Sequence, residues 1–442
     1  MSRQKATRKE KISSQSNIKP VENNSKIKVN HLQKYLAAII VVVSFIVYAN
    51  TMNHGYALDD YSSIIENKTT QKGFDAIGEI FRTSYRYGYI FVADELYRPV
   101  AKTVLAMEWG ISPNKPSTAH WVNILLFMLT GWLLFKTLVD WLKGNLFVAF
   151  AATLFFITLP IHTEAVANIK SVDEILGFLF GLLMLRSIHK YNVTGNTMSL
   201  LKAALWFLIA IFSKESSITL LAVIPLVGYF FSDKPLKSTW LPTLVCLGVA
   251  FIFLAIRSKV LGPVGISLHP SITDNMLMAA PNLLTRMTTA IYLLGLYLKT
   301  IIAPTVLTFD NSFPQLPIIG VMNWQFIISG IILLAMLVIA IRGWKKKEIY
   351  SFAIFYFFIT ISVSSNLFVI IGTHYGERLM YTPSFGICLL LAVILQRLLS
   401  KKPEEQKSNF LADNKLSLIV VITISLIYGG LTMARNTIWR RN

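Results

Sequence analysis

The sequence predicts an all-α, polytopic membrane protein, and three observations lead to that class. Of the 442 residues, 54% are hydrophobic and 15% are charged, whereas a soluble domain carries about 25% charged residues. The apolar residues form blocks, several of which reach the roughly 20 residues that span about 30 Å of hydrocarbon. These blocks are continuous rather than alternating, and that pattern indicates helices rather than the strands of a closed barrel.

Eleven apolar segments are predicted to cross the membrane, and polar or charged linkers separate most of them. They cover residues 35–52, 120–140, 145–160, 174–190, 201–213, 216–231, 239–257, 323–342, 350–371, 380–399 and 416–434. A twelfth apolar stretch, 283–303, is long enough to cross as well, so its length alone does not decide its status.

The basic residues decide it, because they accumulate in the cytosolic linkers of membrane proteins. With a cytosolic N-terminus, the cytosolic sides of the second, fourth and sixth spans hold Lys143, Arg186, Lys190, Lys234 and Lys237. If 283–303 changed sides, the lysine clusters at 345–347 and 401–402 would face outward. We therefore expect 283–303 to be a re-entrant or surface helix, with eleven crossings and an outer C-terminus.

This arrangement divides the chain into three parts. Residues 1–34 are polar and Lys-rich, which predicts a disordered, basic cytosolic tail. The first apolar run starts too late and is too long for a cleaved signal peptide, so a transmembrane domain follows at 35–434. Its two large outer loops are 53–119 and 258–322, and 435–442 is expected to be an outer C-terminal stub.

Composition also excludes two classes of site. The formal net charge is +19, but the Lys and Arg residues lie in short linkers rather than on one soluble surface, which argues against nucleic-acid binding. The two cysteines, Cys246 and Cys388, both lie inside apolar runs. A disulfide framework or a thiolate metal site is therefore not expected.

The carboxylate pair Asp59-Asp60 follows the first predicted span directly. Adjacent carboxylates repel, so one of the two should have a raised pKa unless a cation neutralises it. Such a pair suits a general base or a divalent-cation ligand. The ordinary interpretation is a solvated pair that caps the next helix, and the pair alone leaves both open.

Three basic residues break the orientation rule. Outer segments beside spans should be poor in Lys and Arg, yet Arg98, Lys214 and Arg378 lie there. A guanidinium or ammonium beside the membrane can hold an anionic phosphate. The ordinary interpretation of Arg98 is an ion pair with Asp94 or Glu95 in its own loop.

The other polar groups on this face also have ordinary interpretations. Lys214 could form an interfacial ion pair with Glu215, and Tyr381, near Arg378, could belong to the aromatic belt. Acidic residues favour the first turn of a helix, which accounts for Asp173 and Glu174 and accounts less well for Glu164.

Together these residues place basic and acidic groups from several distant segments on one face of the membrane. Such a set fits a reaction between a lipid-phosphate-linked donor and an acceptor that approaches from water. A carboxylate would deprotonate the acceptor hydroxyl, and the cations would stabilise the charge on the leaving phosphate.

At the same residues the sequence resembles the transmembrane and tetratricopeptide-repeat O-mannosyltransferase family and its bacterial relatives, within the C-type glycosyltransferase superfamily. The resemblance covers nearly the whole chain after residue 50. Its segments are Asp59-Asp60, Tyr97-Arg-Pro99, His120-Trp-Val-Asn123, Leu159-Pro-Ile-His-Thr-Glu-Ala-Val166, Ser213-Lys-Glu215, Arg286 to Tyr297 leading to Asp310, Ser365-Asn366 and Glu377-Arg-Leu-Met-Tyr-Thr-Pro-Ser384.

The resemblance implies a C-type glycosyltransferase fold and an inverting transfer of a mannose-like sugar. The donor would be a polyprenyl-phosphate sugar, and the acceptor the hydroxyl of a protein Ser or Thr, or else a glycan or lipid. Asp59 or Asp60 would be the base. Arg98, Lys214 and Arg378 would bind the donor phosphate. The supporting residues would be Glu164, Glu174, Glu215, Glu377 and Tyr381. No cofactor is implied, and a divalent cation at the acidic pair is an open alternative.

The sequence departs from the family pattern at two places. Val172 stands where relatives commonly have an Arg, which puts a phosphate contact there in doubt, and the chain ends about where the repeats would begin. The competing hypotheses are a secondary transporter, whose charged groups would lie near the bilayer midplane, and a membrane scaffold without catalysis. The Lys-, Ile- and Asn-rich composition favours a bacterial inner membrane.

Overall fold

The computed structural model describes residues 21–90, 95–232, 234–262, 271–304, 307, 315–400 and 410–440. Within these ranges every regular element is a helix, which confirms the all-α prediction for the described part of the chain. Residues 1–20 of the predicted tail, together with Asp94 and Asp310, lie outside it.

Each of the eleven predicted spans corresponds to a helix. These helices are α1 (Val21–Tyr48), α4 (Pro116–Trp141), α5 (Leu146–Thr158), α7 (Val172–Thr194), α8 (Thr197–Ser213), α9 (Leu220–Phe231), α10 (Trp240–Leu261), α12 (Trp324–Trp344), α13 (Ile349–Ile361), α14 (Tyr381–Leu399) and α16 (Lys415–Asn436). Among the described residues, six helices are long and apolar enough to cross a membrane, or seven if the pair Leu146–Thr158 and Pro160–Ala167 is one bent span. The chain is thus a multi-pass membrane protein by helix length and composition, and the number eleven stays a prediction.

Two spans end where the local sequence cannot continue a helix. α5 ends at Thr158, and Pro160 follows in the short helix η4 (Pro160–His162), because proline lacks the N–H that a helix interior needs. α13 ends at Ile361, well before the predicted end at residue 371. There the chain turns through Asn366, whose φ of 56° is in the left-handed region that Asn tolerates better than most residues.

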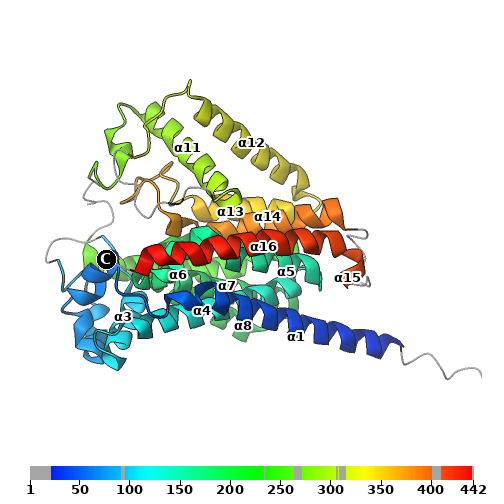
Figure 1. Ribbon diagram of the computed structural model, residues 1–442, viewed down its shortest axis with the longest axis horizontal. Helices are drawn as coiled ribbons and strands as arrows, with labels where there is room; N and C mark the ends of the chain where they lie inside the picture. The colour runs from blue at the N-terminus through cyan, green and yellow to red at the C-terminus, as the bar shows by residue number, and fades with distance from the viewer. Residues whose placement is uncertain are drawn as a thin grey trace, which may run out of the picture.

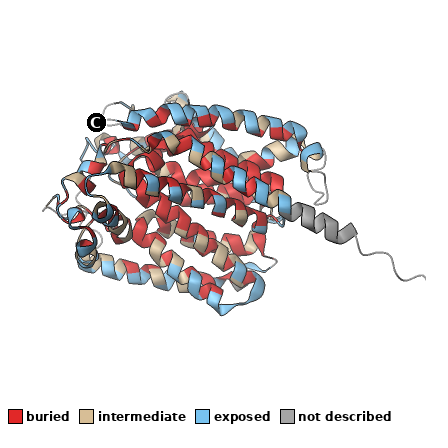
Figure 2. Ribbon diagram, turned by 60° about the horizontal axis from the view of Figure 1, so that its bottom comes forward, coloured by how far each residue is buried: buried red, intermediate tan, exposed pale blue. Residues whose placement is uncertain are grey.

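The bundle is built around α5, which contacts α1, α4, α14 and α16 and is buried along its whole length. α7 contacts α4 and α8 beside it. Figure 2 shows the buried residues along the middle of the bundle and the exposed ones around it. A continuous apolar interior of this kind fixes the ends of the helices relative to one another, and with them the polar groups that those ends carry.

Two helices stand apart from the rest in Figure 1: α11 (Leu283–Ile302) and α12. α12 contacts α11 and α13, and most of its apolar side chains are exposed, as expected for a helix that faces lipid. α11 is held to the bundle by Tyr297, whose ring stacks on that of Tyr375 at 4.2 Å. The hydroxyl of Tyr428 in α16 donates to the carbonyl of Ile302.

The basic linkers meet at one end of the bundle, which we call the basic end. The Lys347 ammonium lies over the ring of Tyr229 near the end of α9, and Arg397 at the end of α14 pairs with Glu348. The Asn145 amide, beside Lys143, bonds to Gln396. The lysines at 345–347 thus share an end with Lys143, as expected if 283–303 does not change sides.

The opposite end carries the first predicted outer loop, and we call it the loop end. This loop folds into η2 (Tyr61–Ile65), η3 (Thr70–Ala76), α2 (Ile77–Ile80) and α3 (Pro99–Ile111). The last helix, α16, also ends here (Figure 1) and continues into η10 (Thr437–Arg440). The side chain of Trp439 is buried against Ala57 and Ala167, so residues 435–440 of the predicted stub form part of the wall of this end.

Candidate active site

Asp60 is a buried link between two segments of the loop end. One carboxylate oxygen accepts a hydrogen bond from the backbone N–H of Ala57, and the other accepts one from the backbone N–H of Lys170, both at 2.8 Å. Burial raises the pKa of Asp60 to about 7, although these two hydrogen bonds oppose the shift. Both oxygens are therefore occupied in holding the chain together.

Asp59 faces the other way and is 33% exposed. Its Oδ2 atom lies 3.8 Å from the Lys170 ammonium and 3.4 Å from the Arg378 guanidinium. Lys170 holds the pKa of Asp59 below its usual range, and Arg378 adds to that effect. Of the two aspartates, Asp59 is thus the one that is ionised, accessible and next to cations.

Asp173, in the first turn of α7, is the buried centre of the charged groups. Its Oδ2 atom lies 2.6 Å from the Arg98 guanidinium, 3.5 Å from the Lys214 ammonium and 3.8 Å from the Lys170 ammonium. The prediction from sequence treated Asp173 as an ordinary helix-capping residue. The structure shows instead that it draws three cations from separate elements to one point.

Lys214 and Glu215 are adjacent in sequence and pair in different directions. The Lys214 ammonium is 2.6 Å from Glu174, while the carboxylate of Glu215 is 3.2 Å from Arg98 and 3.9 Å from Arg257. The ordinary interpretation of Lys214 and Glu215 as an ion pair with each other is therefore wrong, because the backbone between α8 and η6 (Glu215–Thr219) is extended at Lys214 and turns the two side chains apart.

Arg378 lies in η9 (Glu377–Met380), just before α14. Its guanidinium is 2.7 Å from Glu164 of α6 (Thr163–Ala167), and its backbone N–H donates to the same carboxylate. Glu164 therefore fixes both the backbone and the side chain of Arg378. Arg378 in turn reaches Asp59, so α6, η9 and the acidic pair form one connected unit.

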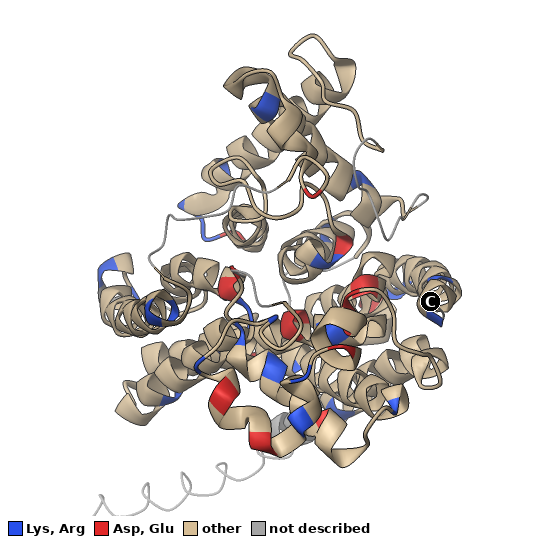
Figure 3. Cartoon of the chain, turned by 90° about the vertical axis from the view of Figure 1, so that its left-hand side faces the viewer, with Lys and Arg blue, Asp and Glu red and all other residues tan. Residues whose placement is uncertain are grey.

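We call the connected ion pairs the charged cluster. It contains five cations and five carboxylates, Arg98, Lys170, Lys214, Arg257, Arg378, Asp59, Glu164, Asp173, Glu174 and Glu215. Figure 3 looks onto the loop end, where acidic and basic residues gather at the centre of the bundle. Each of the five cations is held in place by at least one carboxylate of the cluster.

Two predicted supporting residues lie outside this cluster. Glu377 points away from it, to Arg435 of α16, at 2.7 Å. Tyr381 is fully buried and packs against Phe156, His162 and Phe178. The aromatic-belt interpretation of Tyr381 is therefore wrong, and the residue supports the packing of α14 on α5 and α7.

The pair between Glu377 and Arg435 gives a prediction about stability. Arg435→Met should destabilise the protein by about 3 kcal/mol, because it leaves the charge of Glu377 buried without this cation. The double variant Glu377→Gln with Arg435→Met removes both charges and should recover most of that loss. Thermal unfolding in detergent measures both, and equal midpoints for the two variants would contradict the prediction.

Sequence reasoning missed Lys170, Asp173 and Arg257 as members of the cluster. Lys170 and Arg257 meet the criterion that singled out Arg98, since each is a basic residue beside the loop end of a predicted span. Lys170 also bears on Val172, one of the two places where the sequence departs from the family pattern. The side chain of Val172 is buried among apolar groups. The cation near this turn is Lys170, two residues earlier.

The acidic pair does not fit a divalent cation. Both oxygens of Asp60 already accept backbone hydrogen bonds, and Oδ2 of Asp59 already contacts two cations. Among the described residues, no group of three or more His, Cys, Asp and Glu side chains is placed to hold a metal ion. The donor set at Asp59 suits a proton acceptor better than a metal ligand.

Comparison with known proteins finds several protein O-mannosyl-transferases that are similar to this chain. The chain is 25% identical over 364 residues to protein O-mannosyl-transferase F38B6.6 of Caenorhabditis elegans, which covers 81% of this chain and 51% of that protein. It is 26% identical to human protein O-mannosyl-transferase TMTC3 over 437 residues, covering 91% and 46% of the two chains. Human TMTC2 is 26% identical over 483 residues, covering 89% and 56%. No family model matches the sequence.

The chain spans about half the length of these curated relatives. The identity is low, but it extends over most of this chain in each comparison. The resemblance predicted from the sequence is confirmed: along most of its length, this chain is similar to the protein O-mannosyl-transferases.

Proposed function

We propose that the protein transfers a mannose-like sugar from a polyprenyl-phosphate donor to the hydroxyl of a protein Ser or Thr, with inversion, at the outer face of a bacterial inner membrane. The single observation that carries this proposal is the position of Asp59. It is an accessible carboxylate within 3.4 and 3.8 Å of two cations, at the end of a membrane bundle. The similarity to proteins named protein O-mannosyl-transferases supports the choice of sugar and acceptor.

Each part of the cluster has a role in this reaction. Asp59 accepts the proton of the acceptor hydroxyl as its oxygen attacks the anomeric carbon. The bond between that carbon and the phosphate oxygen breaks, and its electrons remain on the polyprenyl phosphate. Arg98, Lys170, Lys214 and Arg378 stabilise that charge. One base and one displacement give inversion, because no protein nucleophile forms an intermediate.

The position of the cluster favours this reaction over transport. The charged groups lie at the loop end of the bundle rather than midway along it, where a transporter usually binds its substrate. With eleven crossings and a cytosolic N-terminus, the loop end faces outward and meets both lipid-linked donors and secreted acceptors. A glycan or lipid acceptor would use the same base.

The direct test is transfer of labelled sugar by the purified protein in lipid nanodiscs. Polyprenyl-phosphate mannose and polyprenyl-phosphate glucose serve as donors, and Ser- and Thr-containing peptides as acceptors. We expect a glycosidic product whose anomeric configuration is opposite to that of the donor, and whose sugar alkali releases from the peptide by β-elimination. A product that retains the donor configuration would overturn the single-displacement mechanism, and the absence of any transfer would overturn the function.

Lys170 gives this reaction a defined dependence on pH. Burial lowers the pKa of its ammonium to about 8, although Asp173 and Asp59 oppose the shift. The ammonium is therefore charged below that pH and neutral above it, so kcat/KM for the donor should fall by about tenfold per pH unit beyond pH 8. In Lys170→Arg this alkaline fall should disappear, because a guanidinium stays protonated. An unchanged profile would show that Lys170 is not the group that titrates.

A further inference from the structure

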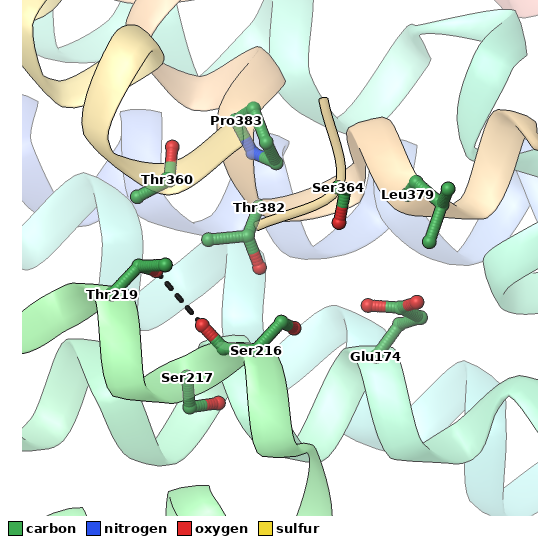
Figure 4. A pocket seen from close by; sticks show the side chains of 9 residues that line it. All are labelled: Glu174, Ser216, Ser217, Thr219, Thr360, Ser364, Leu379, Thr382 and Pro383. Carbon is green, nitrogen blue, oxygen red and sulfur yellow. Dashed lines mark hydrogen bonds between the residues drawn. The ribbon is translucent and has the colours of Figure 1, made fainter. Parts of the chain in front are cut away.

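The buried cations of the charged cluster are not all held equally closely. The Lys214 ammonium lies 2.6 Å from Glu174, whose side chain lines a small cavity (Figure 4). The Lys170 ammonium is buried to a similar extent, but it lies 3.8 Å from both Asp59 and Asp173. Both of these distances are too long for a hydrogen bond. The carboxylates alone therefore fix the position of Lys170 less firmly than that of Lys214.

Tyr85, in the first outer loop, makes a further contact with this ammonium. The Lys170 ammonium lies over the ring of Tyr85, 5.8 Å from its centroid, which is within the range of a cation–π interaction. Tyr85 is buried in the apolar cluster that includes Ile169 and Val172, on either side of Lys170 in the sequence. Its backbone N–H also donates to the carbonyl of Leu96. The ring is therefore held beside the turn that carries Lys170.

The surroundings of Lys170 show what the ring contributes. The charged groups that act on its ammonium are three carboxylates and two guanidiniums: Asp59, Asp60, Asp173, Arg98 and Arg378. The carboxylates favour the charged form of the lysine, whereas the guanidiniums and the burial disfavour it. An aromatic face attracts an ammonium but not a neutral amine, most strongly where water is excluded. Tyr85 therefore acts in the same direction as the carboxylates.

We propose that Tyr85 is a positioning residue for the donor, whose ring keeps the Lys170 ammonium charged and next to Asp59, with its N–H groups open to the donor phosphate. This inference rests on the proposed function and adds a residue that acts through Lys170. Because Asp59 and Asp173 lie beyond hydrogen-bond distance of the ammonium, a phosphate oxygen can accept one of its N–H groups without breaking a hydrogen bond to either carboxylate.

Binding of polyprenyl-phosphate mannose in nanodiscs, without an acceptor, measures this role across a range of pH. The donor is a phosphodiester with no second phosphate proton, so a change in affinity with pH belongs to the protein. In the wild type, binding should weaken above about pH 8, as Lys170 loses its proton. In Tyr85→Leu the weakening should begin about one pH unit lower, because leucine keeps the site apolar but offers no ring to the ammonium. At pH 8 this shift corresponds to about a fivefold loss of affinity.

Two further variants separate the ring from the rest of the side chain. Tyr85→Phe keeps the ring and should bind the donor with the pH dependence of the wild type. Tyr356→Leu is the matched control, because Tyr356 is also fully buried but its ring packs against Phe385 of α14. It should lower the unfolding midpoint without moving the pH dependence. Tyr85→Met makes the same test with a longer apolar side chain if Tyr85→Leu does not fold.

The outcomes separate this role from the function on which it rests. Weakening at the same pH in Tyr85→Leu as in the wild type, or at a higher pH, would overturn the role of Tyr85. The same downward shift in Tyr85→Phe would assign the effect to the hydroxyl, and in Tyr356→Leu to a general loosening of the fold; either would also overturn it. Wild-type protein that binds the donor with this pH dependence but transfers no sugar would overturn the proposed function and leave the role of Tyr85 in donor binding intact.

Discussion

Asp59→Asn is expected to lower kcat for sugar transfer by about 10²- to 10⁴-fold, the usual contribution of a general base. The amide has nearly the shape of the carboxylate but takes up no proton. Because Arg378 keeps its 2.7 Å pair with Glu164 in the variant, the loop end should keep its geometry. The KM for the donor should change by only a few fold, and steady-state kinetics in nanodiscs measure both constants.

Asp60→Asn is the matched control for that experiment, since it makes the same change one residue away. An Asn side chain has one acceptor oxygen, so it can accept from Ala57 or from Lys170 but not from both. Its main effect should therefore be a lower unfolding midpoint, with loss of kcat smaller than in Asp59→Asn. Full activity in Asp59→Asn, or a larger loss of kcat in Asp60→Asn, would move the base assignment away from Asp59.

Most of the fold could be predicted because it depends on properties that sequence shows directly. Apolar length identified the positions of the helices, and the distribution of lysines correctly placed 345–347 at the same end as Lys143. The end of α13 was placed too late because hydropathy does not register a turn such as the one through Asn366. Local backbone geometry, rather than polarity, ends that helix.

Most residues of the charged cluster could be predicted from the sequence, apart from Lys170, Asp173 and Arg257, but the ion pairs between them could not. The rule that outer segments are poor in basic residues found Arg98, Lys214 and Arg378, and all three lie in the cluster. The carboxylate that each of these three cations contacts depends on packing between segments about 40 to 320 residues apart in the sequence. No local sequence pattern encodes contacts of that kind. The burial of Asp60 rather than Asp59 could not be predicted from the sequence either. Adjacent side chains point in different directions, and the local backbone conformation decides which of the two is buried.

Asp173→Asn should have the largest effect on stability, a loss of about 5 kcal/mol. Arg98, Lys170 and Lys214 all lie within 3.8 Å of its carboxylate, and all three are nearly buried. Removal of the shared anion leaves three nearly buried like charges close together, each with only one carboxylate partner of the cluster, and this is far more costly than losing an exposed pair. The unfolding midpoint in detergent should fall by at least about 5 °C.

Glu79→Gln provides the comparison, because it removes a carboxylate from an exposed pair with Lys72 in the same loop region. That change should cost less than about 1 kcal/mol, since water and salt already screen the pair. The cluster also predicts the response to ligand: donor phosphate brings back one negative charge among the three cations. Polyprenyl phosphate should therefore raise the midpoint of Asp173→Asn more than that of the wild type. An equal rise in both proteins would mean that the phosphate binds elsewhere, and that Arg98 and Lys214 serve the fold alone.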